Sequence, residues 1–376
     1  MAHPGLASRL LRWFDRHKRD LPWRREPRDP YHVWLSEVML QQTQVATVIP
    51  YFERWVRRFP TLDALAAAPL DEVLKLWEGL GYYARARNFH AAAQIVVRDY
   101  GGQLPRTVEG LMALPGVGRY TAGAIASLAF GARAPVLDGN VRRVLSRVFG
   151  LGRPSEAELW ALAESLLPQD RTGAFNEALM ELGATICTPR APQCSACPLR
   201  TMCKAYASGD PEAYPAKPAK RATPHYEVLT AVIIDSAGRV LLGRRPRDGL
   251  LGGLWEFVSS ELRTPDANAR KRSHTDPTDL TDPSDLTDLI ASRSGLKVKA
   301  GNAEPLGAVK HAFTHFKLTR RVWLVRLPAP GRTPPLTNGY DRLIWAAPEE
   351  VERLALTRSD RRIWEMYRAR PPSLFD

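Results

Sequence analysis

The chain has 376 residues, of which 44% are apolar, and its 53 Lys and Arg against 40 Asp and Glu give a formal net charge of +13. This length predicts two or three domains with ordinary cores, and no stretch approaches the ~20 consecutive apolar residues that a membrane span needs. The charge fits either a polyanionic partner such as nucleic acid or a solvated basic surface.

Residues 1–206 carry the pattern of an almost entirely helical region. Apolar side chains recur at helical spacing, and Pro and Gly separate the successive segments. The stretch 207–225 that follows contains prolines and basic residues, and it predicts a semi-extended linker between domains.

From residue 226 the pattern changes to that of β-strands. Glu227–Asp235 is rich in β-branched and apolar residues, and Arg321–Leu327 alternates polar and apolar positions with period two. Between them lies a low-complexity stretch with Thr-Asp and Ser-Asp repeats. We expect residues 263–290 to form a disordered insertion, because such residues cannot build a core.

The segment Ser36–Val45, S-E-V-M-L-Q-Q-T-Q-V, carries an unusual carboxylate. Glu37 has apolar neighbours, and a carboxyl group in an apolar pocket suits a general acid at neutral pH. The alternative is an ordinary Glu on an exposed helix face. Gln41, Gln42 and Thr43 follow, and side-chain amides can hydrogen-bond base edges, although ordinary packing would also explain them.

Two glycine-containing turns come next. The first leads into Tyr82, whose ring could wedge into a base stack. In the second, Leu114–Gly118 (L-P-G-V-G), Gly116, Val117 and Gly118 would leave backbone amides at a helix start, where they can bind a phosphate. A plain helix–helix turn is the alternative.

Asp138 follows about 20 residues after this turn, in V-L-D-G-N. It is placed to cap the helix expected over Val141–Phe149, and a rigidly held carboxylate could also stabilise a cation in a cleft. Arg142 and Arg143 are either phosphate contacts or solvated helix residues.

All four cysteines lie in one short window with the spacing C-x6-C-x2-C-x5-C, and this economy predicts one tetrathiolate centre. Disulfides are not expected, because the N-terminal residues have no apolar signal core. A [4Fe–4S] cluster tolerates such uneven spacing, whereas structural zinc usually takes two close pairs. Both remain open from spacing alone. The ligands would be Cys187, Cys194, Cys197 and Cys203.

Taken together, the L-P-G-V-G hairpin, the Asp138 loop and the cysteine loop resemble the helix-hairpin-helix DNA glycosylases related to endonuclease III. Ser36–Val45, the G-L-G-Y-Y-A-R-A-R-N segment and V-L-D-G-N-V-R-R-V-L further resemble the adenine DNA glycosylase (MutY) branch. The resemblance covers residues 8–206, and it implies that the cysteines hold a [4Fe–4S] cluster.

The same resemblance separates two mechanisms. Bifunctional relatives carry a lysine two residues after the second hairpin glycine, and its amine forms a Schiff base. Here that position is Tyr120, and a phenol cannot form an imine. The chain should therefore be monofunctional, with Glu37, Asp138, Tyr120 and Asn140 as its catalytic residues.

Gly249–Phe257 (G-L-L-G-G-L-W-E-F) resembles the lead-in to the Nudix box of MutT-like hydrolases. The R-E-x-x-E-E helix that should follow is missing, so we expect no Mg²⁺-dependent pyrophosphatase activity. A Nudix-like domain without this catalysis implies recognition of an oxidised guanine. Phe313, Thr314 and His315 match the family's lesion-reading loop.

The resemblance implies a multi-domain chain in which an all-α glycosylase precedes an α+β Nudix-like domain. The expected domains are a six-helix barrel at 29–131, an iron–sulfur domain from 1–28 and 132–206, a linker at 207–225 and the Nudix-like domain at 226–376.

It also implies hydrolysis of the N-glycosidic bond of adenine opposite 8-oxoguanine or G, by a retaining-type mechanism. Glu37 would be the general acid, and Asp138 would stabilise the oxocarbenium ion.

We expect a cytoplasmic, nucleoid-associated monomer that binds double-stranded DNA containing A:8-oxoguanine or A:G and no membrane. A glycosylase that removes thymine from G:T pairs is the nearest rival, and a non-catalytic mismatch-binding module is another.

Overall fold

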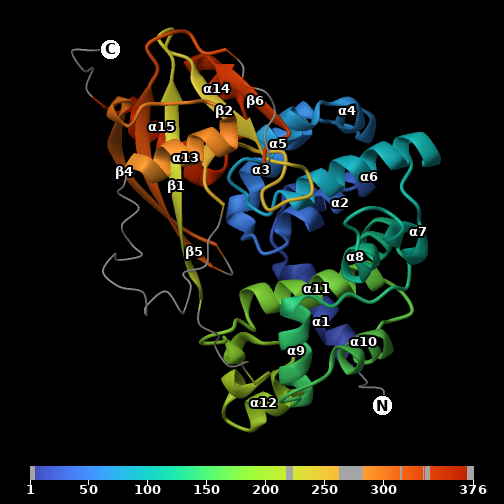
Figure 1. Ribbon diagram of the computed structural model, residues 1–376. Helices are drawn as coiled ribbons and strands as arrows, with labels where there is room; N and C mark the ends of the chain where they lie inside the picture. Colours follow the sequence, from blue (N-terminus) through green and yellow to red (C-terminus); the bar gives the residue numbers. More distant parts are fainter. Residues whose placement is uncertain are drawn as a thin grey trace. The chain divides into compact units, whose positions relative to one another are not determined.

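The computed structural model describes residues 5–216, 223–261, 283–313, 316–332, 334 and 339–370 (Figure 1). Its internal contacts divide the chain into two units. The first comprises Met1–Ala68 and Arg87–Lys220, and the second comprises Pro69–Ala86 and Arg221–Asp376.

The first unit is helical, which confirms the fold class expected for this half. Helix α6 (Ala84–Tyr100) begins in the second unit and continues into the first. The other helices of the first unit are α1 (Leu6–His17), η1 (Pro22–Arg24), α2 (Pro30–Leu40), α3 (Val45–Arg58), α4 (Leu62–Ala67), α7 (Val108–Met112), α8 (Arg119–Phe130), α9 (Gly139–Phe149), α10 (Glu156–Ser165), α11 (Thr172–Thr185), η2 (Cys194–Ala196), η3 (Arg200–Met202), α12 (Lys204–Ala207) and η4 (Pro211–Ala213).

Local sequence explains where the helices next to the pocket begin. The Asp29 side chain accepts from the amide of Tyr31 at 2.8 Å, and Pro30 occupies the first position of α2, where its missing N–H costs nothing. Helix α10 begins with a capping box between Ser155 and Glu158.

One core of the first unit joins α1 to α8, α9, α10 and α11, with Leu10, Val141, Leu159 and Phe175 all fully buried. Helix α11 approaches its neighbours closely because it carries glycine at the crossing points. A Cβ on Gly183 would lie 2.6 Å from the Cβ of Asn140. This close packing holds α9 and α11 on two sides of the site described below.

The second unit contains a six-stranded sheet in the order β4-β5-β1-β3-β2-β6, in which β1 and β5 are parallel and the other pairs are antiparallel. Its elements are α5 (Leu70–Trp77), β1 (His225–Ile234), β2 (Val240–Arg244), β3 (Trp255–Ser259), α13 (Pro283–Ser294), η6 (Ala300–Asn302), β4 (Ala303–Ala312), β5 (Lys317–Arg326), β6 (Arg342–Ala346), α14 (Pro348–Arg353) and α15 (Arg358–Arg368).

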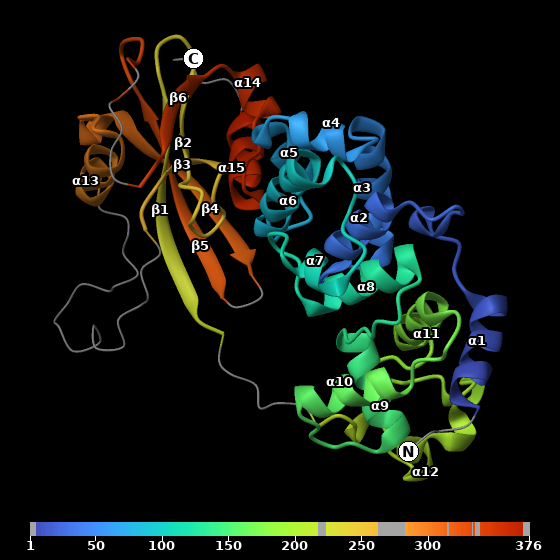
Figure 2. The same ribbon diagram turned by 90° about the vertical axis from the view of Figure 1, so that its right-hand side faces the viewer.

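Helices α13 and α15 cover opposite faces of this sheet (Figure 2). Alternate residues of β1 point to each face, so that Val232 joins the core beneath α15 and Ile233 joins the core beneath α13. This layered α+β arrangement confirms the fold class expected for the C-terminal half.

The expectation of a disordered insertion over 263–290 is wrong for its last part, because Pro283–Ser294 forms helix α13. Leu286, Leu289 and Ile290 recur at helical spacing and are buried against the sheet. The rest of that segment, residues 263–282, lies outside the described residues. Among the described helices, none has the length and apolar character needed to cross a bilayer.

Candidate active site

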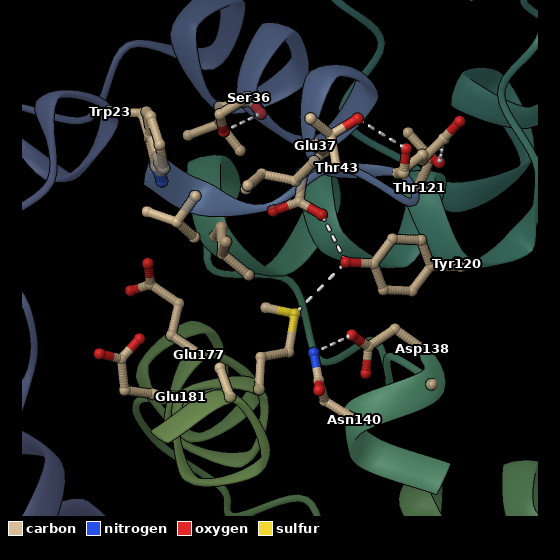
Figure 3. A pocket seen from close by; sticks show the side chains of 18 of the residues that line it. Trp23, Ser36, Glu37, Thr43, Tyr120, Thr121, Asp138, Asn140, Glu177 and Glu181 are labelled. Carbon is tan, nitrogen blue, oxygen red and sulfur yellow. Dashed lines mark hydrogen bonds between the residues drawn. The ribbon is translucent and has the colours of Figure 1, made fainter. Parts of the chain in front are cut away.

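A pocket of about 1220 Å³ lies wholly within the first unit (Figure 3). The residues before α2, the end of α2, the α7–α8 hairpin and parts of α8, α9 and α11 line it. It brings together Glu37, Tyr120, Asp138 and Asn140, which are the four residues that the sequence predicts to be catalytic.

Glu37 lies on α2 with only 5% of its surface exposed, next to the buried side chains of Val38 and Met39. Burial raises the pKa of Glu37 to about 7, the hydrogen bond from Tyr120 opposes this rise, and the nearby Asp138 carboxylate adds to it. A carboxyl group that is half protonated near neutral pH can act as a general acid there.

Tyr120 lies in the first turn of α8, directly after the hairpin, and its hydroxyl donates to Glu37 Oε2 at 2.6 Å. The same hydroxyl is 3.3 Å from the sulfur of Met180 on α11. Burial and the two nearby carboxylates raise the pKa of Tyr120 well above its ordinary value. The phenol therefore stays protonated and serves Glu37 as a donor.

Asp138 caps α9, and its Oδ1 accepts from the amide of Val141 at 2.7 Å. The side-chain amide of Asn140 donates to its Oδ2 at 2.9 Å. Burial raises the pKa of Asp138, while these hydrogen-bond donors oppose the rise. Asp138 therefore has more donors favouring its ionised form than Glu37 has, so the two carboxyl groups lie in different hydrogen-bonding environments.

The Asn140 side chain is itself positioned by Arg143. Arg143 donates to its Oδ1 at 2.9 Å, to the carbonyl of Gly183 at 2.7 Å and to the carbonyl of Cys187 at 2.7 Å. The structure thus turns the Arg143 guanidinium toward α11 and the cysteine loop, whereas the partly exposed Arg142 lies 3.9 Å from Glu156.

Sequence reasoning missed a set of buried ion pairs that lines the same pocket. Glu177 and Glu181 on α11 have almost fully buried side chains. Arg24 bridges both of them at 3.0 Å, Arg19 reaches Glu181 at 2.6 Å and Arg28 reaches Glu177 at 2.8 Å. Partners compensate the burial of these charges, so this wall of the pocket is polar and rigid.

The sequence around Glu177 and Glu181 does contain a pattern that indicates buried acidic residues. Glu177 and Glu181 are four residues apart in the apolar sequence A-F-N-E-A-L-M-E-L-G-A, so they lie on one face of a helix that is otherwise buried. This is the same pattern of an acidic residue in an apolar setting that singled out Glu37.

Gln41, Gln42 and Thr43, predicted to contact DNA, all line the pocket where α2 ends. The side-chain amide of Gln41 donates to the Thr121 hydroxyl at 3.3 Å. Gln42 has φ +56°, a left-handed conformation that non-glycine residues adopt rarely.

The hairpin predicted from L-P-G-V-G connects α7 to α8. Gly116 has φ +76°, and a Cβ there would lie 2.6 Å from the Cβ of Asn88, so only glycine fits without a shift. Val117 is buried, whereas Gly116 and Gly118 line the pocket.

The remaining predicted contacts belong to the second unit. Tyr82 is 40% exposed and has φ +50°. Phe313 follows β4 and stacks on Phe316 with ring centroids 4.4 Å apart. Thr314 and His315 lie outside the described residues.

Cys187, Cys194, Cys197 and Cys203 all line one small cavity between α9 and the loop after α11. Among the described residues, no three His, Cys, Asp or Glu side chains are arranged to hold one metal ion. In a [4Fe–4S] cluster each thiolate binds a different iron, so the four sulfurs need not converge on a single point. The donor set fits such a cluster better than one zinc ion.

The surroundings of these sulfurs support the same interpretation. Backbone N–H groups of Leu199 and Tyr206 hydrogen-bond to Cys197 and Cys203, and Arg147 donates to Cys187 Sγ at 3.4 Å. Hydrogen bonds to the sulfurs are typical of iron–sulfur sites. Burial raises the pKa of Cys197 to about 11, so a bound centre would have to displace the thiol proton.

Comparisons with known proteins agree with this geometry. Residues 35–169 match the HhH-GPD superfamily of base excision DNA repair proteins, and residues 229–366 match the NUDIX domain. The chain is 39% identical to an adenine DNA glycosylase of Homo sapiens, with 96% of this chain and 74% of the relative covered. It is 42% identical to one of Buchnera aphidicola subsp. Acyrthosiphon pisum, with 96% of each covered.

Among solved structures, a thermostable thymine-DNA glycosylase matches 54% of this chain and 95% of its own with a TM-score of 0.50 and 34% identity. The glycosylases related to endonuclease III and MutY are known to carry a 4Fe–4S cluster. With a helical glycosylase half and a Nudix-like half, this chain is a DNA-binding glycosylase of base excision repair, and it belongs to the adenine DNA glycosylase family.

Proposed function

We propose that the chain is a monofunctional adenine DNA glycosylase that acts on adenine opposite 8-oxo-7,8-dihydroguanine, or opposite G, in duplex DNA. One observation carries the proposal: two buried carboxyl groups with different hydrogen-bonding environments line one pocket together with Tyr120. The names of the relatives support adenine as the base removed.

The reaction begins with extrusion of the adenine nucleotide, because the base is inaccessible inside the duplex. Tyr82 and the Gln41–Thr43 turn are the candidates for filling or opening the gap. The polar wall formed by Arg24, Glu177 and Glu181 offers donors and acceptors that could read the edge of the extruded base.

Glu37 then protonates a ring nitrogen of adenine, because the neutral base leaves far more easily than its anion. The C1′–N9 bond breaks, and its electron pair departs with the base. A pKa of about 7 leaves much of Glu37 protonated at neutral pH. Tyr120 donates a hydrogen bond to the carboxylate that remains.

The sugar is left as an oxocarbenium ion, which Asp138 stabilises by charge or by a transient bond to C1′. Water then adds to C1′ and loses a proton to the Glu37 carboxylate, which restores the acid. This division of roles between two carboxyl groups parallels that of retaining glycosidases. Tyr120 cannot form an imine, so the product is an abasic site with an intact strand.

The four cysteines would hold a [4Fe–4S] cluster, which supplies a structural and electron-transfer centre. None of the bond-breaking steps requires it. It would instead shape the loop after α11, next to the α9 residues that hold Asn140 in place.

The Nudix-like part would recognise the base opposite adenine. The sequence after Phe257 is Val258-Ser259-Ser260-Glu261 and lacks the R-E-x-x-E-E carboxylates that hold Mg²⁺. The segment that follows β4, where Phe313 stacks on Phe316, is the candidate for reading that base. We further propose that the protein acts as a monomer in the cytoplasm.

The test is single-turnover base release from duplexes that contain A:8-oxoguanine, A:G or G:T. We expect adenine release with a preference for 8-oxoguanine over G and no release of thymine. Phe313→Ala should reduce this preference severalfold while base release from A:G persists. Release of thymine, or of no base at all, would contradict the proposal.

A further inference from the structure

The loop that carries Tyr82 is contacted by the C-terminal part of the chain. Residues 69–86 fall in the same unit as residues 221–376. Arg361 on α15 pairs with Glu78 through Nε and Oε1 at 2.9 Å, and Lys75 Nζ donates to the carbonyl of Leu354 at 3.1 Å. Two helices far apart in sequence, α5 and α15, are thus tied together at the end of α5.

This tie lies directly before the loop. Glu78 is the C-cap that directly follows α5, and Gly79 and Gly81 come next with φ +102° and +72°. Glycine leaves such a loop free to adopt many conformations. Tyr82 is then held at φ +50°, a left-handed conformation that is unfavourable for a residue with a side chain. Such conformations persist only where surrounding contacts enforce them.

Some of the enforcing contacts come from the segment itself. Trp77 Nε1 donates to the carbonyl of Gly81 at 3.0 Å, and Arg85 donates to the same carbonyl at 3.1 Å. The Arg85 guanidinium also lies 5.4 Å from the centroid of the Tyr82 ring. These contacts fix the far end of the loop. At its beginning the Gly79 amide donates to the Tyr83 hydroxyl at 3.3 Å, and Glu78 provides the ion pair with the C-terminal part of the chain.

Two cations hold Glu78: Lys75 of its own helix at 2.7 Å and Arg361 of α15 at 2.9 Å, so Arg361 supplies the ion pair from the C-terminal part of the chain. Its side chain is 18% exposed and that of Glu78 is 16% exposed, so water screens the pair less than it would an ordinary surface pair. The guanidinium also donates to Glu352 at 2.9 Å and to the carbonyl of Leu354 at 3.1 Å. Arg361 is therefore held in one orientation before it meets Glu78.

We propose that Arg361 and Glu78 are positioning residues for Tyr82, through which the part of the chain that reads the opposite base holds the ring that enters the base stack. This inference rests on the proposed function, because it takes Tyr82 as the wedge. It predicts that breaking the pair slows extrusion of adenine and leaves the chemistry at Glu37 intact.

The experiment follows extrusion directly, in the full-length protein. The fluorescence of 2-aminopurine placed opposite 8-oxoguanine rises when the base leaves the stack, and stopped-flow mixing gives the rate. We expect Arg361→Ala and Glu78→Gln each to slow this rise roughly three- to tenfold, in line with a partly buried ion pair. The double variant should be no slower than the slower of the two single variants. Arg353→Ala, which removes the same charge from the exposed end of α14, should match the wild type.

Combining Arg361→Ala with Tyr82→Ala tests whether the Arg361–Glu78 pair acts through the Tyr82 ring. Tyr82→Ala should slow extrusion, and adding Arg361→Ala should then have no further effect. Wild-type rates for both Arg361→Ala and Glu78→Gln, beside a slow Tyr82→Ala, would overturn this inference and leave the proposed function standing. A wild-type rate for Tyr82→Ala would instead remove the wedge itself. Thermal unfolding establishes that each variant is folded, and Glu78→Gln decides the matter if Arg361→Ala is not.

Discussion

Glu37 combines three features that are rarely found on one carboxyl group: near-complete burial, one strong donor in Tyr120, and a second carboxylate nearby. Burial disfavours its charged form more than the single hydrogen bond favours it. The pKa is therefore raised to about 7, a value that suits the proposed protonation of adenine at neutral pH.

We expect Glu37→Gln to abolish most base release while DNA affinity is retained. The amide has nearly the same shape but no proton to give, and general acids typically contribute roughly 10²–10⁴-fold. Single-turnover kinetics on an A:8-oxoguanine duplex measures the loss. Glu53→Gln on the exposed side of α3 is the matched control. A rate close to that of the wild type would place the acid elsewhere.

The rate of the wild type should fall as the pH rises through about 7, because the protonated form of Glu37 disappears there. In the pH profile of single-turnover base release, this decline should be missing from the residual activity of Glu37→Gln. A wild-type profile that is flat between about pH 6 and 8 would contradict the assignment.

The raised pKa also has a consequence for stability. Between its ordinary value of 4.5 and about 7 the folded protein binds more protons at Glu37 than the unfolded chain does, so this group makes folding less favourable as pH rises. The cost at pH 8 is on the order of 3 kcal/mol. Glu37→Gln should therefore unfold at a higher temperature than the wild type at pH 8, by a margin that narrows toward pH 5. Equal margins at both pH values would argue against the buried charge.

At the scale of elements, the site depends on how closely α9 and α11 pack. Gly183 of α11 faces Asn140 at a distance that leaves no space for a methyl group. The α2–α8 pair brings Glu37 to Tyr120 across 83 positions of sequence. The catalytic geometry is thus a property of helix crossings rather than of any one segment.

Gly183→Ala should push α11 away from Asn140 and Arg143. We expect a loss of about 1–3 kcal/mol in the free energy of unfolding, partly offset by the better helix propensity of alanine, together with slower base release. Chemical denaturation and single-turnover kinetics measure both effects. Gly152→Ala, where a Cβ meets nothing within 4 Å, is the control. Unchanged kinetics would show that the α9–α11 spacing does not set the site.

At the scale of the whole molecule, a basic chain contains a pocket in which buried carboxyl groups and arginines lie side by side. The net charge of +13 suits attraction to DNA, while arginines offset the charges of Glu177 and Glu181 in the pocket and leave Glu37 and Asp138 without an ion pair among the salt bridges of the described residues. The proposed stabilisation of a cationic sugar therefore depends on two particular carboxyl groups and not on the net charge of the chain.

The purified protein should absorb light at about 400 nm and contain about four iron atoms per chain, as a [4Fe–4S] cluster requires. Cys197→Ala should lower both values and destabilise the loop after α11, because metal binding is coupled to local folding. Iron analysis and absorbance spectroscopy test this. A colourless protein that contains zinc would contradict the cluster.

The sequence by itself determined what depends on neighbours along the chain. The helical and β halves, the glycine hairpin before α8 and the cap that Asp138 makes three residues ahead of Val141 all follow from local spacing and backbone chemistry. The family resemblance also rested on such short motifs. The sequence pattern did not reveal α13, because its buried leucines lie in a repetitive polar stretch.

Only the tertiary structure decided which charges are buried together. Arg24 meets Glu177 153 positions further along the chain, and Tyr120 meets Glu37 across the α2–α8 contact. Burial and long-range pairing set the desolvation of each group, and desolvation dominates the raised pKa of Glu37. No local sequence pattern gives the desolvation of a side chain, because desolvation depends on the atoms that folding brings around that side chain.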